Sequence, residues 1–182
     1  FTIGEPQFAT PPFITDEIEK YKNEFSKYPK SAGEPYLKEA ILYFLERRFS
    51  VEATLEQVIP TFGTREVLFN LPQFLLFDKS SKKIAFTNPF YQIYEGASIA
   101  SRSEVVHINL ENFDNKSAIE LAKGCSVVIL NYPNNPTGAR MDKAGWRAWV
   151  EAALEHDFVL ISDECYSDIY RGEPRSEERR VG

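Results

Sequence analysis

The 182-residue chain is long enough for one domain with a substantial hydrophobic core. Its hydrophobic content of 43% and charged content of 26% are those of an ordinary globular protein, and no apolar run is long enough to span a membrane. The net charge of -6 argues against a nucleic acid or an anionic membrane surface as a partner.

The amino-terminal quarter is predicted to be helical. Phe1 is not a start methionine, and no signal-peptide pattern follows it, so we expect the chain to begin inside a longer protein. A proline-rich opening leads into a predicted helix over 14–25, and the loop YPKSAGEP separates it from an amphipathic helix over 36–49. One face of this second helix is predicted to carry Leu37, Ile41, Phe44 and Leu45.

From residue 58 onward, predicted strands and helices alternate. The strands are predicted at 58–62, 83–87, 104–108, 126–132 and 158–162, and the helices at 65–77, 91–100, 117–122 and 142–156. This alternation predicts an α/β fold in which a mostly parallel sheet is flanked by helices on both faces. Ligands of such sheets bind at the carboxyl ends of the strands, so the turns after the strands are where functional residues are expected.

The first of these turns can bind an anion, and the second can bind a flat ring. Gly63-Thr64-Arg65 opens a helix, whose free amide groups and dipole form a phosphate site to which the Thr64 hydroxyl can contribute. An ordinary capped helix start is the alternative. Tyr91 follows the strand at 83–87 and is placed to stack on a ring, although an aromatic of the core is the commoner case.

The last two turns carry amide and carboxylate side chains. The segment PNNPTG after the strand at 126–132 is either a structural loop or a functional one, and its doubled Asn exceeds what a simple connection needs. Asp163 ends an apolar strand, where an unpaired carboxylate is costly to bury. It therefore needs a partner, either a structural Arg or Lys or a cationic ligand.

Other classes of site find little support in the sequence. His107 and His156 lack ligand spacing to these carboxylates, so we expect no metal and interpret both as structural. Glycine-rich nucleotide motifs and a nucleophile elbow are missing from the sequence. Cys125 and Cys165 lie in apolar, strand-like segments, which favours buried free thiols in a reducing cytoplasm over a disulfide.

In their order and spacing, these loops resemble those of the class I and II aminotransferases, enzymes of fold type I that depend on pyridoxal 5'-phosphate (PLP). The most specific parts are NYPNNPTG at 131–138 and SDECYSDIY at 162–170, and the resemblance runs from about residue 2 to residue 170. It implies PLP as cofactor, an amino acid and a 2-oxo acid as substrates, and a homodimer.

The resemblance also implies a division of the chain. Residues 1–35 would form an amino-terminal arm and part of the small domain, and 36–174 the first part of the PLP-binding large domain. Residues 175–182 would be a tail that is either foreign to the protein or disordered, because the segment is highly charged and lacks apolar periodicity.

Several residues acquire roles from the resemblance. Asp163 would pair with the protonated ring nitrogen of PLP, and Asn135 and Tyr166 would hydrogen-bond its phenolic oxygen. Tyr91 would stack on the ring. We expect five side chains to converge on one cleft: Thr64, Tyr91, Asn135, Asp163 and Tyr166.

The remaining roles concern the phosphate and the substrate. The phosphate would be held by Gly63, Thr64 and Arg65. Tyr28 would reach the phosphate bound by the partner subunit, which would make the dimer functional. Gly4 would lie beside the substrate carboxylate, which Asn135 would also contact.

Two expected parts of the family pattern are missing from the sequence. The family's Schiff-base lysine follows the Asp-x-x-Tyr motif, but the last lysine here is Lys143, and the arginine that binds the substrate carboxylate belongs to the carboxyl-terminal part. We therefore expect an aminotransferase whose isolated 182-residue part is inactive. A PLP-dependent C–S lyase of the same fold is one alternative. Another is an aminotransferase-like sensory domain of a transcription regulator, which the net negative charge does not support.

Overall fold

The computed structural model describes residues 8–111 and 113–169. Its helices are α1 (Pro12–Tyr21), α2 (Pro35–Phe49), α3 (Thr64–Leu75), α4 (Ile93–Ser101), α5 (Asn115–Ala122) and α6 (Lys143–His156), with short 3-10 helices at Lys22–Ser26 and Leu55–Gln57. Its strands are β1 (Lys83–Asn88), β2 (Glu104–Asn109), β3 (Val127–Asn131) and β4 (Val159–Asp163).

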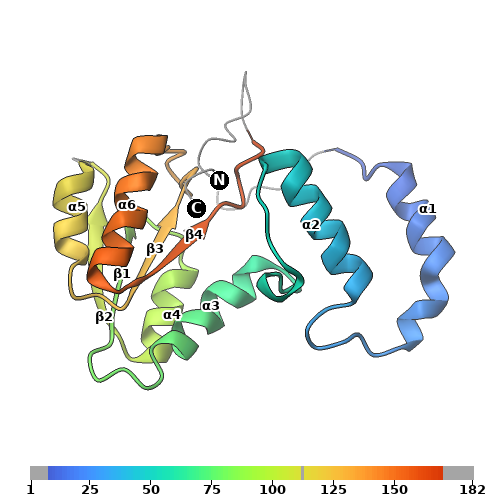
Figure 1. Ribbon diagram of the computed structural model, residues 1–182, viewed down its shortest axis with the longest axis horizontal. Helices are drawn as coiled ribbons and strands as arrows, with labels where there is room; N and C mark the ends of the chain where they lie inside the picture. The colour runs from blue at the N-terminus through green and yellow to red at the C-terminus, as the bar shows by residue number, and fades with distance from the viewer. Residues whose placement is uncertain (1–7, 112, 170–182) are drawn as a thin grey trace.

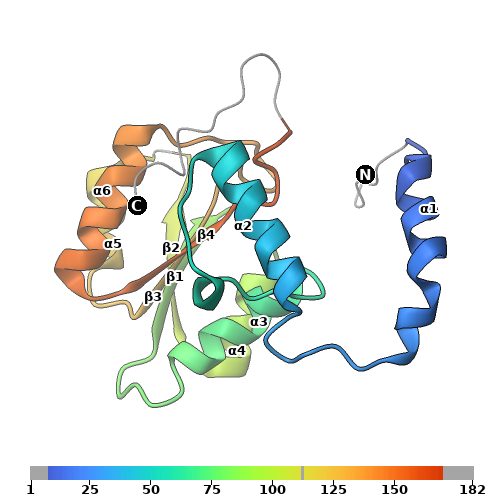
Figure 2. The ribbon, with the colours of Figure 1, turned by 45° about the vertical axis from the view of Figure 1, so that its right-hand side comes forward.

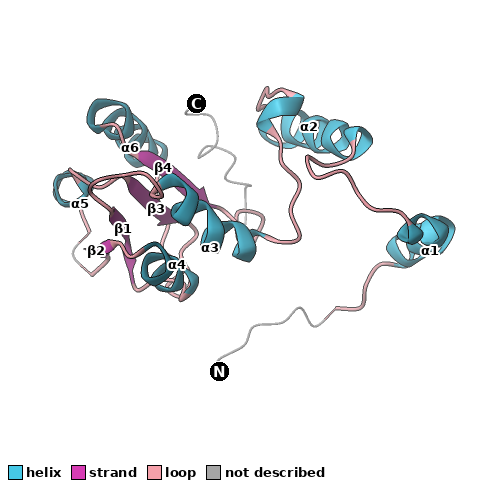
Figure 3. Ribbon diagram, turned by 90° about the horizontal axis from the view of Figure 1, so that it is seen from below, coloured by secondary structure: helices cyan, strands magenta, loops and turns pink. Residues whose placement is uncertain are grey.

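The four strands form one parallel sheet in the order β2-β1-β3-β4. Helices α5 and α6 cover one face, and α3 and α4 cover the other (Figures 1 and 3). Strand β3 is buried along its whole length, which explains why its sequence is apolar without alternation from Val127 to Leu130. The predicted fold class, a parallel α/β sheet flanked by helices, is confirmed.

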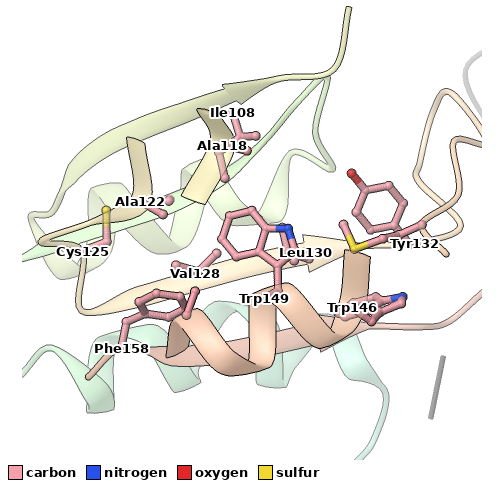
Figure 4. Packing of buried hydrophobic residues seen from close by; sticks show 13 residues of the cluster. Ile108, Ala118, Ala122, Cys125, Val128, Leu130, Tyr132, Trp146, Trp149 and Phe158 are labelled. Atoms are coloured by element: carbon pink, nitrogen blue, oxygen red, sulfur yellow. The ribbon is translucent and has the colours of Figure 1, made fainter. Parts of the chain in front are cut away.

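Each face of the sheet has its own hydrophobic cluster. Val128 and Leu130 of β3 point toward α5 and α6, and Val127 and Ile129 point toward α3 and α4. Trp149 of α6 is fully buried in the first cluster (Figure 4). The indole N–H of Trp149 donates to the Oδ1 atom of Asn115 at 3.1 Å, so the same side chain also joins α6 to α5.

The predicted strand over 58–62 is wrong. This segment is extended coil without a ladder partner in the described part of the chain, and Ile59 and Phe62 are 73% and 94% exposed. Pro60 lies in its middle and has no N–H group to donate to a neighbouring strand. Pro60 instead lies against Gly33, where a Cβ atom would come within 2.6 Å of the proline ring.

The two amino-terminal helices bury little of their apolar surface. The predicted helix over 14–25 starts at Pro12, and its α-helical part ends at Tyr21 before a turn of 3-10 helix. Helix α1 has no buried residue and stands apart from the sheet and its covering helices (Figures 1 and 2). In α2, Leu37 and Phe44 are exposed, and only Phe49 is fully buried.

The two cysteines differ in environment. Cys125 is buried and free, as predicted. Cys165 is also free but exposed, which corrects the prediction that both thiols are buried. The reason is that β4 ends at Asp163, so Cys165 lies in the following turn rather than in a strand. No helix in the described part of the chain has both the length and the apolar composition needed to cross a lipid bilayer.

Candidate functional site

Residues at or after the carboxyl ends of β1, β3 and β4 meet the start of α3 at one cavity of about 150 Å³. Its walls are formed by Thr64, Arg65, Leu68, Tyr91, Asn131, Asn135, Asp163, Cys165 and Tyr166. The five side chains that the sequence predicted to converge are all among these residues, so their convergence is confirmed. Their roles toward a cofactor remain predictions.

The pairing of β3 with β4 places the two most polar strand ends side by side. Asn131 and Asp163 are register partners in the parallel ladder. The Asn131 side chain donates from Nδ2 to the backbone oxygen of Asp163 at 2.9 Å and accepts at Oδ1 from the amide of Asn135 at 2.7 Å. One buried amide side chain therefore fixes both the end of β4 and the loop that follows β3.

Asp163 is buried, with 6% of its surface exposed, and a tyrosine donates a hydrogen bond to its carboxylate. The hydroxyl of Tyr94 donates to Oδ2 of Asp163 at 2.5 Å. Burial is the main cause that raises the pKa of Tyr94, and this hydrogen bond is the next largest. The hydroxyl therefore stays protonated and acts as a donor. Within residues 8–111 and 113–169, no Lys, Arg or His forms an ion pair with Asp163. The carboxylate is thus hydrogen-bonded but its charge is not neutralised.

Asn135 and Tyr166 lie together at the rim of the cavity. The Nδ2 group of Asn135 donates to the Tyr166 hydroxyl at 3.3 Å. Partial burial raises the pKa of Tyr166 above its ordinary value, although the Asn135 contact opposes the shift. Tyr166 is therefore a protonated phenol near neutral pH, and both residues offer N–H or O–H donors to a ligand.

The start of α3 forms another wall. Gly63 precedes the helix with a φ of 120°, a conformation that favours glycine, and no side chain caps the helix start. The backbone amides of the first turn therefore lack intrahelical acceptors and are available to an anion. Thr64 and Arg65 line the cavity, whereas Gly63 does not. Tyr91 completes this side, with its ring perpendicular to that of Tyr94 at 5.9 Å between centroids.

Asn134 holds the loop that carries Asn135. Its buried side chain donates to the Thr87 hydroxyl at 3.3 Å and accepts from the amide and the hydroxyl of Thr137 at 3.2 and 2.7 Å. The loop after β3 is thereby tied to the end of β1. The doubled Asn thus has two separate tasks, since Asn134 faces the protein and Asn135 faces the cavity.

Replacing Asn134 with Ala is expected to lower the free energy of unfolding of the whole protein by about 1–3 kcal/mol, because the buried Thr87 hydroxyl loses a hydrogen bond and the loop loses its contacts with Thr137. The matched change Asn135→Ala should lower it less, since that side chain is only half-buried. Urea unfolding of the two variants measures the difference. Equal midpoints for both variants would contradict this role of Asn134.

Besides Gly63, two predicted site residues lie away from the cavity or beyond the described part. Tyr28 is fully exposed in the loop between the first 3-10 helix and α2, where it lines a separate depression. Gly4 lies outside the described residues, as does the predicted tail at 175–182.

His107 stacks on the ring of Phe90, with 5.6 Å between the ring centroids. No group of three or more potential metal ligands comes together in the described residues.

The sequence did not identify four residues that shape the site. Tyr94, Asn131 and Asn134 act through contacts with distant elements, and Cys165 reaches the cavity only because β4 ends two residues before it. A signal existed for Tyr94, because it follows Tyr91 by three residues and the predicted helix over 91–100 would place both on the same side.

Comparisons with known proteins agree with this geometry. The family model for aminotransferase class I and II matches residues 1–182. The aspartate/prephenate aminotransferase of Thermus thermophilus is 31% identical over 180 residues, which cover 94% of this chain and 46% of that protein. The LL-diaminopimelate aminotransferase of Maridesulfovibrio salexigens is 29% identical over 182 residues, which cover 95% of this chain and 46% of that protein. The chain therefore spans about half the length of the curated relatives it matches.

Solved structures give the same result. The aminotransferase AspB from Helicobacter pylori superimposes with a TM-score of 0.86 at 45% identity, over 94% of this chain and 47% of that one. The aspartate aminotransferase from Thermus thermophilus with maleate has a TM-score of 0.86 at 30% identity, over 99% of this chain and 49% of that one. The parallel sheet with helices on both faces matches the large domain of these enzymes. The chain belongs to the aminotransferase class I and II family.

Proposed function

We propose that the protein containing this chain is a PLP-dependent aminotransferase that moves an amino group between an amino acid and a 2-oxo acid. The observation that carries the proposal is the buried Asp163 carboxylate, which faces a cavity without a cationic partner in the described part of the chain. A buried negative charge of this kind favours a ligand that brings its own positive charge.

The cavity fits PLP in its charges and donors. The open start of α3 suits the phosphate, and the Asp163 carboxylate suits a protonated ring nitrogen. Asn135 and Tyr166 offer hydrogen bonds to a phenolic oxygen. Three sets of polar groups therefore match three functional groups of one small molecule, which supports the proposal more than any single contact does.

In the proposed reaction, PLP supplies a cationic ring that draws electrons from the substrate carbon. Asp163 would hold the proton on the ring nitrogen, because its anionic form stabilises the adjacent positive charge. Asn135 and Tyr166 would donate to the phenolic oxygen, and Tyr91 would bound one face of the ring. The Thr64 hydroxyl and the amides at the start of α3 would hold the phosphate.

Further parts of the proposal depend on protein outside this chain. The covalently bound lysine and the carboxylate-binding arginine would come from the rest of the protein. Tyr28 would reach the phosphate in the partner subunit of a homodimer, and its full exposure leaves it free to do so. Gly4 would lie near the substrate. We also keep the division into an arm at 1–35 and the first part of the large domain at 36–174.

The test of the proposed function is amino transfer by the whole protein. We expect stoichiometric PLP and transfer from at least one of aspartate or LL-diaminopimelate, two substrates in the names of the relatives. Amino acid analysis before and after incubation with 2-oxoglutarate measures the reaction. Release of ammonia and a thiol from a thioether amino acid, without amino transfer, would instead identify a C–S lyase.

A further inference from the structure

Tyr94 makes a hydrogen bond that the packing of its ring does not require. It lies in the first turn of α4 and is fully buried, and its ring packs against Phe86 at 5.8 Å and Tyr91 at 5.9 Å between centroids. A phenylalanine would fill this apolar position equally well. The hydroxyl nevertheless extends to the carboxylate of Asp163, 69 residues further along the chain.

The two contacts of Asp163 with Tyr94 and Asn131 restrain different parts of the residue. Asn131 holds the backbone oxygen of Asp163, whereas Tyr94 holds the carboxylate atom Oδ2. Rotation of the carboxylate about its Cβ–Cγ bond would break the Tyr94 hydrogen bond and leave a buried phenol without its partner. That loss is costly in the interior, so the carboxylate keeps one orientation.

We propose that Tyr94 is a positioning residue for the proposed reaction: its hydroxyl fixes the Asp163 carboxylate so that the carboxylate meets the ring nitrogen of the cofactor. This inference rests on the proposed function. Tyr94 itself touches neither cofactor nor substrate in this role, and it acts only through Asp163.

A tyrosine suits this task better than a lysine or an arginine would. Either cation would neutralise Asp163 and so weaken its attraction for a protonated ring nitrogen. A phenol donates the same hydrogen bond but leaves the negative charge in place. Because burial raises the pKa of Tyr94, the hydroxyl remains a neutral donor throughout the physiological pH range.

The experiment compares Tyr94→Phe with a matched control in the whole protein. Tyr132 is also a buried tyrosine, but its hydroxyl has no hydrogen-bond partner among the described residues, so Tyr132→Phe removes the same atom from the other face of the sheet. We expect Tyr94→Phe to raise the dissociation constant of PLP about tenfold, the size expected for one hydrogen bond to a charged group. Tyr132→Phe should leave it within about twofold, an effect smaller than the ordinary worth of one hydrogen bond.

Two further readouts separate positioning from packing. The visible absorption of bound PLP depends on ring protonation, so Tyr94→Phe should shift the spectrum in the same direction as Asp163→Asn, but less. In a double-mutant cycle, Tyr94→Phe should add no further loss of PLP affinity once Asp163 is Asn. If Tyr94→Phe fails to fold by circular dichroism, Tyr94→4-fluorophenylalanine fills the space of the hydroxyl and provides the same test.

The outcomes distinguish this inference from the function on which it rests. Equal PLP affinity and spectra for the Tyr94 and Tyr132 variants would overturn the positioning role, as would additive losses in the double variant. Failure of the wild-type protein to bind PLP would overturn the proposed function and this inference together. Loss of affinity in Asp163→Asn without any in Tyr94→Phe would reject Tyr94 alone.

Discussion

Replacing Asp163 with Asn in the whole protein is expected to lower kcat for amino transfer about 100-fold or more, the range seen when one preorganised electrostatic group is removed. The neutral amide cannot stabilise a positive charge on the ring nitrogen, so the ring withdraws electrons less strongly. Steady-state kinetics of the PLP-saturated variant measures the loss. Saturation matters, because the variant is also expected to bind PLP more weakly.

The fold should tolerate this change. Asn has nearly the volume of Asp, and its side-chain oxygen can still accept the Tyr94 hydroxyl, so the thermal midpoint should stay close to that of the wild type. Asp168→Asn is a suitable control, because it removes a carboxylate from the same segment but breaks only an exposed ion pair with Arg48. Near-normal turnover in a well-folded Asp163→Asn variant would remove Asp163 from its proposed role.

The isolated 182-residue polypeptide is expected to show no transaminase activity. Amino transfer requires an amine that holds PLP covalently and then moves a proton between the substrate carbon and the cofactor. Every lysine of this chain lies at or before Lys143, and none follows Asp163, where the family places that residue. No lysine is among the described residues that line the cavity.

Borohydride reduction in the presence of PLP provides the measurement. Mass spectrometry of the isolated polypeptide should find no single lysine labelled stoichiometrically, whereas the whole protein should show one such site. Noncovalent binding through Thr64, Tyr91 and Asp163 can still give weak PLP affinity, so binding alone is not decisive. One specifically labelled lysine together with measurable amino transfer would contradict the prediction and identify a relocated catalytic amine.

The sequence predicted the sheet well because each strand of this fold has a local signature. β3 is apolar at nearly every position since both of its faces are covered, and the helices around it have clear apolar spacing. The segment 58–62 has the same composition as a strand. This segment does not pair with a strand because Pro60 lacks an N–H group and because no strand of the described part of the chain lies beside it. The position of neighbouring strands is a property of the tertiary structure, which the local sequence does not reveal.

The sequence could predict which residues converge on the site wherever those residues follow strands of the parallel sheet. Residues after parallel strands meet at one edge, which is why Asn135 and Asp163 could be placed together from sequence. The partner of Asp163 could not be, because the sequence analysis expected a structural Arg or Lys or a cationic ligand and did not consider a neutral donor. The packing of α4 against the sheet brings the Tyr94 hydroxyl to 2.5 Å from Asp163, which no local pattern in the sequence indicates.

Substitutions in the hydrophobic cores on the two faces of the sheet are expected to differ in their effect on the cavity. None of the residues that line the cavity belongs to the cluster beneath α5 and α6, whereas Leu68 and the contacts of Tyr94 belong to the cluster beneath α3 and α4. Repacking around Trp149 can therefore be used to adjust thermal tolerance with the cavity left intact. The opposite layer offers no such freedom, because there the residues that give stability also form or support the site.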